Sequence, residues 1–402
     1  MGTLLERYRE VTLPGTVDLL HRLAEPLRGL EVLHVNSTRL GGGVAEILHR
    51  LIPLQEDVGL RPRWDVIAGT EEFFAVTKAF HNALQGRGIL LTPQMRQIYL
   101  DCVRANAERM DLGAEAVVIH DPQPAALVEK RRSGASWIWR CHIDLSHPDR
   151  EFWEFLRSYV VRYDAAIFTL PKFARRLSIP QIVEYPSIDP LSEKNIELSE
   201  SEVRSTVERL GIPPDRPMVL QVSRFDRFKD PVGVIKAFKL LRRHVDCTLV
   251  LAGGGATDDP EGAAVLAEVR AAAEADRDIF ILDLPPTAHR EINALQRAAA
   301  VIVQKSTREG FGLTVTEAMW KGKPVVGGLA GGIPTQVLHE VTGYLVSTVE
   351  GAAFRIYTLL ENPDLAARMG EEGREHVRRN FLITQNLRDA LVLLTWLRER
   401  GR

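Results

Sequence analysis

Glu31-Val-Leu-His-Val35 is a short run rich in β-branched and aliphatic residues, and the tight loop Gly41-Gly42-Gly43 and the helical pattern of Val44–Val58 follow it. A strand, a glycine loop and a helix in this order are typical of α/β proteins, in which such units repeat. The pattern does repeat, with further strands expected at Arg63–Ile67, Ala116–His120, Trp137–Cys141 and Ala165–Thr169. Helical stretches lie between these runs, so the sequence predicts a parallel, doubly wound sheet.

The alternation weakens between Tyr185 and Pro217, a stretch rich in proline and in charged residues. A second series of strands then begins, at Met218–Val222, Thr248–Ala252, Ile279–Leu282, Ala300–Val303, Pro324–Val326 and Gly343–Val346. We therefore expect two Rossmann-like domains, 1–190 and 191–380, and a final helix at about 381–402 that packs back on the first domain. Ligands bind at the carboxyl ends of parallel strands, so we expect a site in a cleft between two such sheets.

The composition limits the partners and the compartment. The chain has 402 residues, of which 45% are hydrophobic, and its 51 Lys and Arg against 53 Asp and Glu give a net charge of −2. This balance favours neither nucleic acid nor an anionic membrane as a partner, and no apolar run approaches the roughly 18 residues of a membrane helix. Cys102, Cys141 and Cys247 are far apart, so neither a disulfide framework nor a zinc site is expected. The charged N-terminal segment lacks the apolar core of a signal peptide, and we expect a cytoplasmic protein.

A basic loop follows the first strand of the second series. Ser223-Arg224-Phe-Asp-Arg-Phe-Lys229-Asp230 leaves the carboxyl end of that strand and precedes a helix. Arg224 offers a planar fork of donors and Lys229 a point charge, a pair that suits a diphosphate. A solvated basic loop is the alternative that these residues alone leave open.

A glycine-containing loop follows a later strand in the same way. In Glu309-Gly-Phe-Gly-Leu-Thr-Val-Thr-Glu317 the glycines allow the backbone to approach a ligand closely. The amides of Gly312, Leu313 and Thr314 would lie at a helix N-terminus, which attracts phosphate and sugar oxygens. The carboxylates of Glu309 and Glu317 can accept hydrogen bonds from sugar hydroxyls. Alternatively, Glu317 only complements the helix N-terminus and Glu309 lies on the surface.

Polar residues also follow strands of the first series. In Trp139-Arg140-Cys-His142-Ile-Asp144, alternation places Arg140, His142 and Asp144 on one side of an extended segment. Their joint burial without a ligand would be costly, so we expect them to face a polar cleft, although a structural His–Asp pair is an alternative.

Two further polar segments are weaker candidates. His120-Asp121-Pro-Gln123 follows a strand, and Asp121 alternatively caps a helix there. His34, Asn36 and Glu46 surround the first glycine loop, which matches neither the dinucleotide motif GxGxxG nor a Walker loop.

These motifs together resemble those of a known family. Glu309 to Glu317 is similar to the E-x7-E motif of the retaining GT-B glycosyltransferases of family GT4, and Arg224 and Lys229 stand where that family keeps its diphosphate-binding Arg and Lys. Four further stretches resemble the trehalose glycosyltransferring synthases: His34–Glu46, His120–Pro124, Trp139–Asp144 and Ser187–Asn195. The resemblance covers nearly the whole chain. It implies an α/β GT-B fold, with two Rossmann-like doubly wound domains that face each other across a deep cleft.

The resemblance also implies roles for the matching residues. Arg224, Lys229, Glu309 and His142 would be the catalytic residues. The donor would contact Arg224, Lys229, Glu309, Phe311, Gly312, Leu313, Thr314, Glu317, Gly42 and Gly43, and the acceptor would contact Asn36, Arg140, His142, Asp144, Asp121 and Gln123. The nucleotide base would lie near Leu282–Pro285. Gly253-Gly-Gly255 departs from the family, in which bulkier residues are expected, and this leaves the nucleotide preference open.

The implied activity is the transfer of glucose from UDP-glucose or ADP-glucose to free glucose, with retention, to give α,α-trehalose in a reversible reaction. The nucleotide sugar is then a co-substrate, no tightly bound cofactor or metal is expected, and Mg²⁺ would act only by pairing with the nucleotide. A homodimer is the assembly we expect. Three alternatives stay open: a trehalose phosphorylase on the same scaffold, a glycoside hydrolase that uses Glu309 and Glu317 as paired carboxylates, and a nucleotide-sugar-binding protein without turnover.

Overall fold

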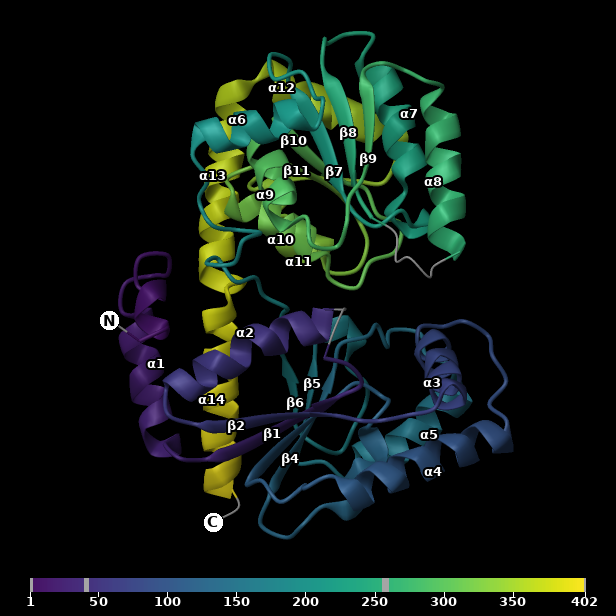
Figure 1. Ribbon diagram of the computed structural model, residues 1–402, viewed down its shortest axis with the longest axis vertical. Coiled ribbons are helices and arrows are strands. Elements are labelled where there is room, and N and C mark those ends of the chain that lie inside the picture. Colours follow the sequence, from purple (N-terminus) through teal and green to yellow (C-terminus); the bar gives the residue numbers. More distant parts are fainter. Residues whose placement is uncertain (1–2, 40–42, 255–259, 401–402) are drawn as a thin grey trace. The chain divides into compact units, whose positions relative to one another are not determined.

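The computed structural model describes residues 3–39, 43–254 and 260–400. The chain forms two compact units: unit 1 comprises Met1–Ser187 and Ile383–Arg402, and unit 2 comprises Ile188–Leu382. Each unit is built on one parallel six-stranded sheet with helices on both faces (Figure 1). The predicted fold class, two doubly wound α/β sheets in series, is therefore confirmed.

The sheet of unit 1 has the strand order β2-β1-β3-β4-β5-β6, and all neighbouring strands are parallel. The strands are β1 (Glu31–Asn36), β2 (Arg61–Val66), β3 (Ala116–His120), β4 (Ser136–Cys141), β5 (Ala165–Phe168) and β6 (Gln181–Val183). The chain runs outward from β1 to β2 and then returns to the other side of β1 with β3. Loops that leave the carboxyl ends of strands at such a reversal diverge, which makes room for a ligand.

Two sets of helices cover the faces of this sheet. They are α1 (Thr16–Ala24), α2 (Gly43–Asp57) and α14 (Ile383–Arg400) on one face, and α3 (Glu71–Leu84), α4 (Pro93–Arg109) and α5 (Arg150–Val160) on the other. Successive strand residues point to opposite faces. Leu33, Trp137 and Trp139 therefore enter the apolar core beneath α3, α4 and α5, whereas His34 and Arg140 point to the face beneath α2 and α14.

The sheet of unit 2 has the strand order β12-β11-β10-β7-β8-β9 and is also parallel throughout. The strands are β7 (Met218–Val222), β8 (Thr248–Gly253), β9 (Ile279–Asp283), β10 (Val301–Gln304), β11 (Val325–Gly328) and β12 (Gly343–Val346). The strand order reverses between β7 and β10. The basic loop after β7 and the glycine-containing loop after β10 are thus neighbours at the point where ligands bind in sheets of this kind.

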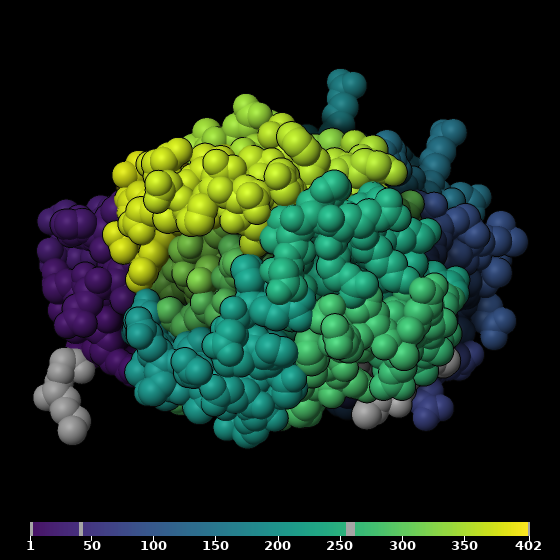
Figure 2. Space-filling view, turned by 90° about the horizontal axis from the view of Figure 1, so that it is seen from above, coloured from purple at the N-terminus to yellow at the C-terminus, as the bar shows by residue number. Residues whose placement is uncertain are grey.

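The helices of unit 2 bury both faces of the sheet. They are α6 (Glu200–Arg209), α7 (Pro231–Leu241), α8 (Pro260–Ala273), α9 (His289–Ala298), α10 (Leu313–Trp320), α11 (Ile333–Gln336), α12 (Val349–Glu361) and α13 (Pro363–Asn380). α7 packs on α8 and α12, and α9 packs on α6. Figure 2 shows one face of the molecule, on which the teal, green and yellow parts of the chain form a closely packed surface.

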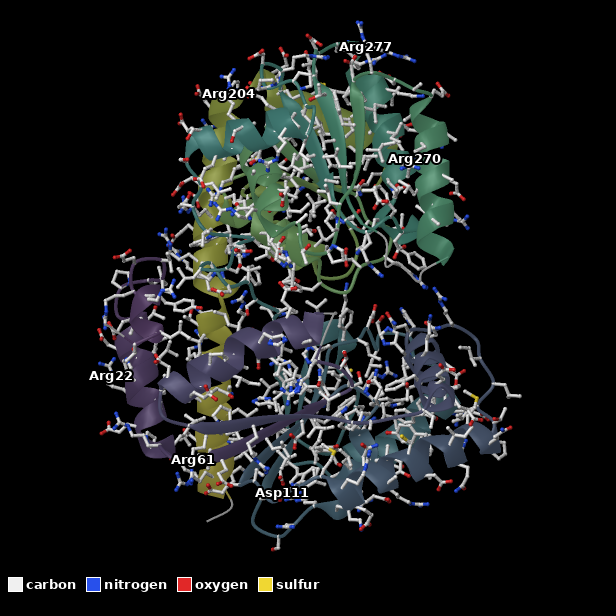
Figure 3. The ribbon with its side chains drawn as sticks, viewed as in Figure 1. Arg22, Arg61, Asp111, Arg204, Arg270 and Arg277 are labelled. Carbon is white, nitrogen blue, oxygen red and sulfur yellow. The ribbon has the colours of Figure 1, made fainter. Side chains whose placement is uncertain are left out.

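Charged side chains lie mainly on the surface of each unit. Figure 3 labels exposed examples, Arg61 and Asp111 in unit 1 and Arg204 and Arg270 in unit 2, whose side chains point into solvent. The charged groups that are buried therefore need an explanation, and several of them belong to the candidate site.

Candidate active site

The loop after β7 in unit 2 is held in place by its own carboxylates. Asp226 accepts a hydrogen bond from the backbone amide of Phe228 (2.7 Å) and begins the short helix Arg227–Lys229. Asp230 has a left-handed backbone (φ 51°) and caps α7 through the amide of Gly233 (3.1 Å). Its other carboxylate oxygen forms an ion pair with Lys305. This frame fixes the backbone on both sides of Lys229.

The two predicted phosphate-site loops meet at an ion pair. Nζ of Lys229 lies 2.6 Å from Oε2 of Glu309, and the two side chains are only 18% and 8% exposed. Glu309 also accepts from the hydroxyl of Ser306 (3.3 Å) and the amide of Gly310 (3.2 Å). The amide of Thr307 donates to the carbonyl of Phe228 (2.8 Å) and joins the loop backbones. An ammonium and a carboxylate are thereby presented together at the carboxyl ends of β7 and β10.

Arg224 differs from Lys229 in its surroundings. Its side chain is 63% exposed, and its nearest carboxylate partner, Asp226, is 3.7 Å away. An exposed pair at this distance contributes little to stability. The guanidinium is therefore available to an anionic ligand at low energetic cost.

α10 begins beside Glu309 and presents free backbone donors. Gly312 has a left-handed backbone (φ 89°) and precedes the helix without a side-chain cap, so that the first amides, including those of Leu313 and Thr314, have no partner within the helix. Such an end attracts anions. Phe311 is buried against Phe381, with ring centroids 5.7 Å apart, so its backbone rather than its ring is offered to a ligand.

Glu317 lies one turn further into α10 and is 5% exposed. Lys321, one turn later, donates to the backbone carbonyl of Glu317 (3.1 Å) and to the side chain of Asn195 (2.9 Å). Burial lowers the pKa of Lys321 to about 7, while the negative charge of Glu317 acts in the opposite direction. The second glutamate of the motif therefore lies in a buried charged environment inside a helix, whereas Glu309 lies in the preceding loop.

Several glycines of unit 2 lie where a side chain would meet the backbone of a site loop. A Cβ on Gly331 would lie 1.9 Å from the carbonyl oxygen of Glu309, and Gly331 also has a positive φ of 52°. A Cβ on Gly253 would lie 1.8 Å from the carbonyl oxygen of Ser223, and one on Gly254 would lie 2.2 Å from that of Leu284. The bulkier residues expected at Gly253 and Gly254 would therefore displace these loops, and Gly255 lies outside the described residues. Sequence analysis did not identify Gly331.

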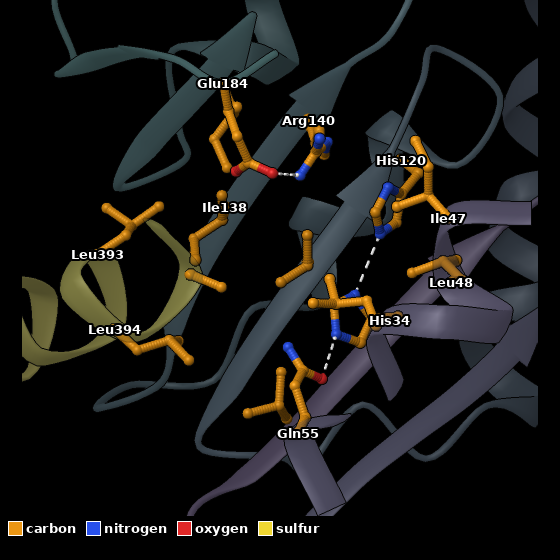
Figure 4. A pocket seen from close by; sticks show the side chains of 15 residues that line it. His34, Ile47, Leu48, Gln55, His120, Ile138, Arg140, Glu184, Leu393 and Leu394 are labelled. Carbon is orange, nitrogen blue, oxygen red and sulfur yellow. Dashed lines mark hydrogen bonds and ion pairs between the residues drawn. The ribbon is translucent and has the colours of Figure 1, made fainter. Parts of the chain in front are cut away.

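In unit 1 the predicted acceptor residue His142 is the end of a chain of histidines. Nδ1 of His34 lies 3.1 Å from Nε2 of His120, and Nδ1 of His120 lies 3.0 Å from Nε2 of His142. The amide oxygen of Gln55 bonds Nε2 of His34 at 3.0 Å. Figure 4 shows the inner part of this chain. Burial lowers the pKa of His34 to about 4 and holds the pKa values of His120 and His142 well below 6.5.

Arg140 shares the face of these histidines but points away from solvent. It forms an ion pair with Glu184, and the two side chains are 6% and 2% exposed (Figure 4). Burial raises the pKa of Glu184, and Arg140 counteracts this effect. A cavity of about 30 Å³ between the pair, the histidines and α14 has room for a water molecule. Sequence analysis did not find Glu184, which follows the short strand β6.

Asp121 holds the backbone of His142 in place. It has a left-handed backbone (φ 68°), and its carboxylate accepts from the amide of His142 (2.7 Å). The short helix that follows runs from Ala125 to Lys130, and Pro124 is its N-cap residue, with no side-chain cap, so the alternative role of Asp121 as a helix cap is wrong. Burial raises the pKa of Asp121 to about 7, although the hydrogen bond from His142 and the charge of Arg140 lower it.

The remaining predicted acceptor residues have different surroundings. The Asn36 side chain is 3% exposed and is bonded to the carbonyl of Thr38 (2.7 Å) and the indole of Trp64 (2.9 Å). Asp144 accepts from the amide of residue 146 (2.7 Å). The buried side-chain oxygen of Gln123 has no hydrogen-bond partner among the described residues, and a ligand hydroxyl would satisfy it.

The structure describes only the last glycine of the loop Gly41-Gly42-Gly43. Gly43 is the first residue of α2, whereas Gly41 and Gly42 lie outside the described residues.

Within residues 3–39, 43–254 and 260–400, no helix is both long and apolar enough to cross a membrane. In the same ranges no group of three or more His, Cys, Asp or Glu could hold a metal ion.

The fold of both units is found in solved glycosyltransferases. An α,α-trehalose-phosphate synthase (UDP-forming) from Burkholderia xenovorans, in complex with glucose-6-phosphate, aligns with a TM-score of 0.72 at 14% identity and covers 92% of this chain and 100% of that one. An Anabaena protein in complex with UDP and glucose aligns with a TM-score of 0.68 at 18% identity and covers 91% of this chain and 100% of that one. At these identities the likeness shows the fold, which is GT-B.

Sequence comparison identifies the family. A family model described as "Trehalose synthase, N-terminal domain" matches residues 34–175, and one described as "Glycosyl transferases group 1" matches residues 203–376. A trehalose phosphorylase from Pleurotus pulmonarius is 29% identical over 435 residues, which cover 93% of this chain and 58% of that protein. A trehalose synthase from Thermococcus litoralis is 48% identical over 399 residues, which cover 98% of this chain and 97% of that protein. The chain is a hexosyltransferase homologue that belongs to the trehalose synthase family of GT4 glycosyltransferases.

Proposed function

We propose that the protein is a retaining glucosyltransferase that makes α,α-trehalose from NDP-glucose, either UDP-glucose or ADP-glucose, and free glucose in a reversible reaction. The observation that carries the proposal is the contact of Lys229 with Glu309 at 2.6 Å, beside the N-terminus of α10. A group that binds phosphate and a group that binds sugar hydroxyls are neighbours, as a sugar joined to a diphosphate requires.

The donor is bound through its α-linked diphosphate. Arg224, Lys229 and the free amides at the start of α10 neutralise the negative charge that grows on the diphosphate as it leaves. Glu309 accepts hydrogen bonds from hydroxyls of the donor glucose and holds its ring while positive charge develops at the anomeric carbon.

The acceptor hydroxyl attacks from the face that the diphosphate leaves, and its proton passes to the departing phosphate oxygen. One glycosidic bond forms as one sugar–phosphate bond breaks, and the α configuration is retained without a protein nucleophile. A hydrolase mechanism would instead need two carboxylates that flank one bond. The burial of Glu317 inside α10, at 5% exposure, favours the transferase.

The relatives support the choice of product. Trehalose synthase is the name of the Thermococcus litoralis protein, which is similar over nearly the full length of both chains. The related fold from Anabaena was solved in complex with UDP and glucose, which supports a nucleoside diphosphate and a sugar as ligands here. We further propose that no cofactor is tightly bound and that Mg²⁺ stimulates only through the nucleotide.

A trehalose phosphorylase is the second candidate, because the Pleurotus pulmonarius protein of that name is also similar. In that reaction inorganic phosphate replaces the nucleoside diphosphate at Arg224 and Lys229. The test is to incubate the protein with trehalose and, separately, with UDP, ADP, phosphate or no addition, and to identify the products by NMR. Formation of NDP-glucose only with a nucleotide supports the synthase. Glucose 1-phosphate formed with phosphate would replace it by the phosphorylase, and glucose released without any addition would indicate a hydrolase.

A further inference from the structure

The histidine chain of unit 1 connects three strands across the face of the sheet that α2 covers. His34 belongs to β1, His120 to β3, and His142 follows β4 directly, and these strands are adjacent in the sheet. His34 and His120 are each 3% exposed, and Gln55 on α2, at the inner end of the chain, is 1% exposed. Each link is 3.0 or 3.1 Å long, so the four side chains form one continuous line of hydrogen bonds.

The line has a direction, because a neutral imidazole carries one N–H and one bare nitrogen. The Gln55 oxygen can only accept, so Nε2 of His34 must donate to it and Nδ1 of His34 must be bare. Nε2 of His120 must then donate to His34, which leaves Nδ1 of His120 as an acceptor. Nε2 of His142 must in turn donate to His120, and the proton is therefore absent from Nδ1 of His142.

The surroundings of the chain keep its rings neutral. Burial is the main cause of the lowered pKa values of the three histidines, and the positive charge of Arg140 adds to it. Arg140 is itself bound to Glu184 on the same face of the sheet. With neutral rings, Gln55 decides which nitrogen of each histidine carries the proton.

We propose that Gln55, His34 and His120 are positioning residues that hold His142 in the tautomer with a bare Nδ1, which accepts a hydrogen bond from a hydroxyl of the bound sugar. The inference rests on the proposed function, because it concerns a residue of the proposed sugar site. His142 is suited to this role because the residue is not fully buried, unlike His34 and His120, its Nε2 is occupied by His120, and its backbone amide is held by Asp121. No hydrogen bond joins Nδ1 of His142 to another of the described residues.

The tautomers can be measured without substrate by NMR of the full-length protein labelled with ¹⁵N-histidine, with resonances assigned by single histidine substitutions. In the wild type we expect protonated Nε2 in all three rings and a bare Nδ1 in His142. Gln55→Met keeps the approximate side-chain shape but removes the accepting oxygen. In this variant His142 should no longer be held in the tautomer with the proton on Nε2. His34→Leu should do the same by cutting the chain one link later. Gln385→Met is the matched control, since it alters another buried glutamine of unit 1, on α14.

The transfer reaction supplies the second readout. Loss of one hydrogen bond that sets the tautomer should lower kcat/KM by about 2- to 10-fold in Gln55→Met, and Gln385→Met should retain the wild-type rate and tautomer. A protonated Nδ1 on His142 in the wild type would overturn the proposal, as would an unchanged His142 tautomer in both Gln55→Met and His34→Leu. A released tautomer with an unchanged rate would overturn the role in sugar binding. Absence of any transfer by the wild type would instead contradict the proposed function and leave the tautomer measurement standing.

Discussion

Replacing Arg224 by alanine should slow catalysis strongly while leaving the fold almost unchanged. The Arg224 side chain is 63% exposed and its contact with Asp226 spans 3.7 Å, so its loss should change the free energy of unfolding by no more than about 0.5 kcal/mol. A donor that stabilises charge only as the leaving group departs is worth about 10²- to 10³-fold in kcat, or roughly 3–4 kcal/mol. The expected effect on the transition state is therefore several times the expected effect on stability.

The same loop provides a matched control. Arg227 lies three residues away and is 62% exposed, but its guanidinium is paired with Glu268 on α8 at 2.5 Å. Initial rates with NDP-glucose and glucose, and thermal melting, should be measured for Arg224→Ala and Arg227→Ala side by side. We expect similar melting temperatures for the two variants and a wild-type rate for Arg227→Ala only. Equal rates in both variants, or a fall in rate in Arg224→Ala that a comparable loss of stability accompanies, would show that Arg224 is not a phosphate-binding residue.

Three further substitutions test other parts of the structure. Lys229→Met should lower kcat by about 10²-fold or more and, unlike Arg224→Ala, should also destabilise unit 2 by about 1–3 kcal/mol, because the largely buried Glu309 loses its cation; an unchanged denaturation midpoint would argue against the ion pair. Gly331→Ala should impair both transfer and stability, since its Cβ would lie 1.9 Å from the carbonyl oxygen of Glu309, and a fully active variant would contradict this packing. Burial lowers the pKa of His34 to about 4 in the folded protein, against about 6.5 in the unfolded chain. Between pH 6.5 and about pH 4 the unfolded chain therefore binds a proton at His34 that the folded protein does not bind. Stability should fall there by about 1.4 kcal/mol per pH unit for each such histidine, and chemical denaturation should show a shallower slope for His34→Gln; an identical slope would mean that His34 titrates normally.

Much of the fold could be predicted because the strands are regular and their ends are marked by glycine or polar loops. From Glu31 and again from Met218, strands alternate with helices along the chain. This alternation predicts a doubly wound sheet, although it does not give the order of the strands. β6 could not be predicted, because its three residues, Gln181–Val183, are too few to show any periodicity.

The candidate site could be predicted only where its residues follow a strand in the sequence. Lys229 and Glu309 were both found, but their direct contact depends on β7 and β10 being neighbours, which a linear pattern does not contain. The link between His34 and His120 joins residues 86 positions apart. Gln55 gave no signal, because a single glutamine on an amphipathic helix is indistinguishable from a solvated one.

The reaction in the forward direction is the most direct test of the proposed function. The purified protein should be incubated with UDP-glucose or ADP-glucose and with free glucose labelled with ¹³C at the anomeric carbon, and the products read by NMR. We predict an α,α-1,1-linked disaccharide with the label in one ring only, formed together with an equal amount of nucleoside diphosphate. A β-configured anomeric carbon from the donor, or nucleoside diphosphate released with glucose and no disaccharide, would contradict a retaining trehalose synthase.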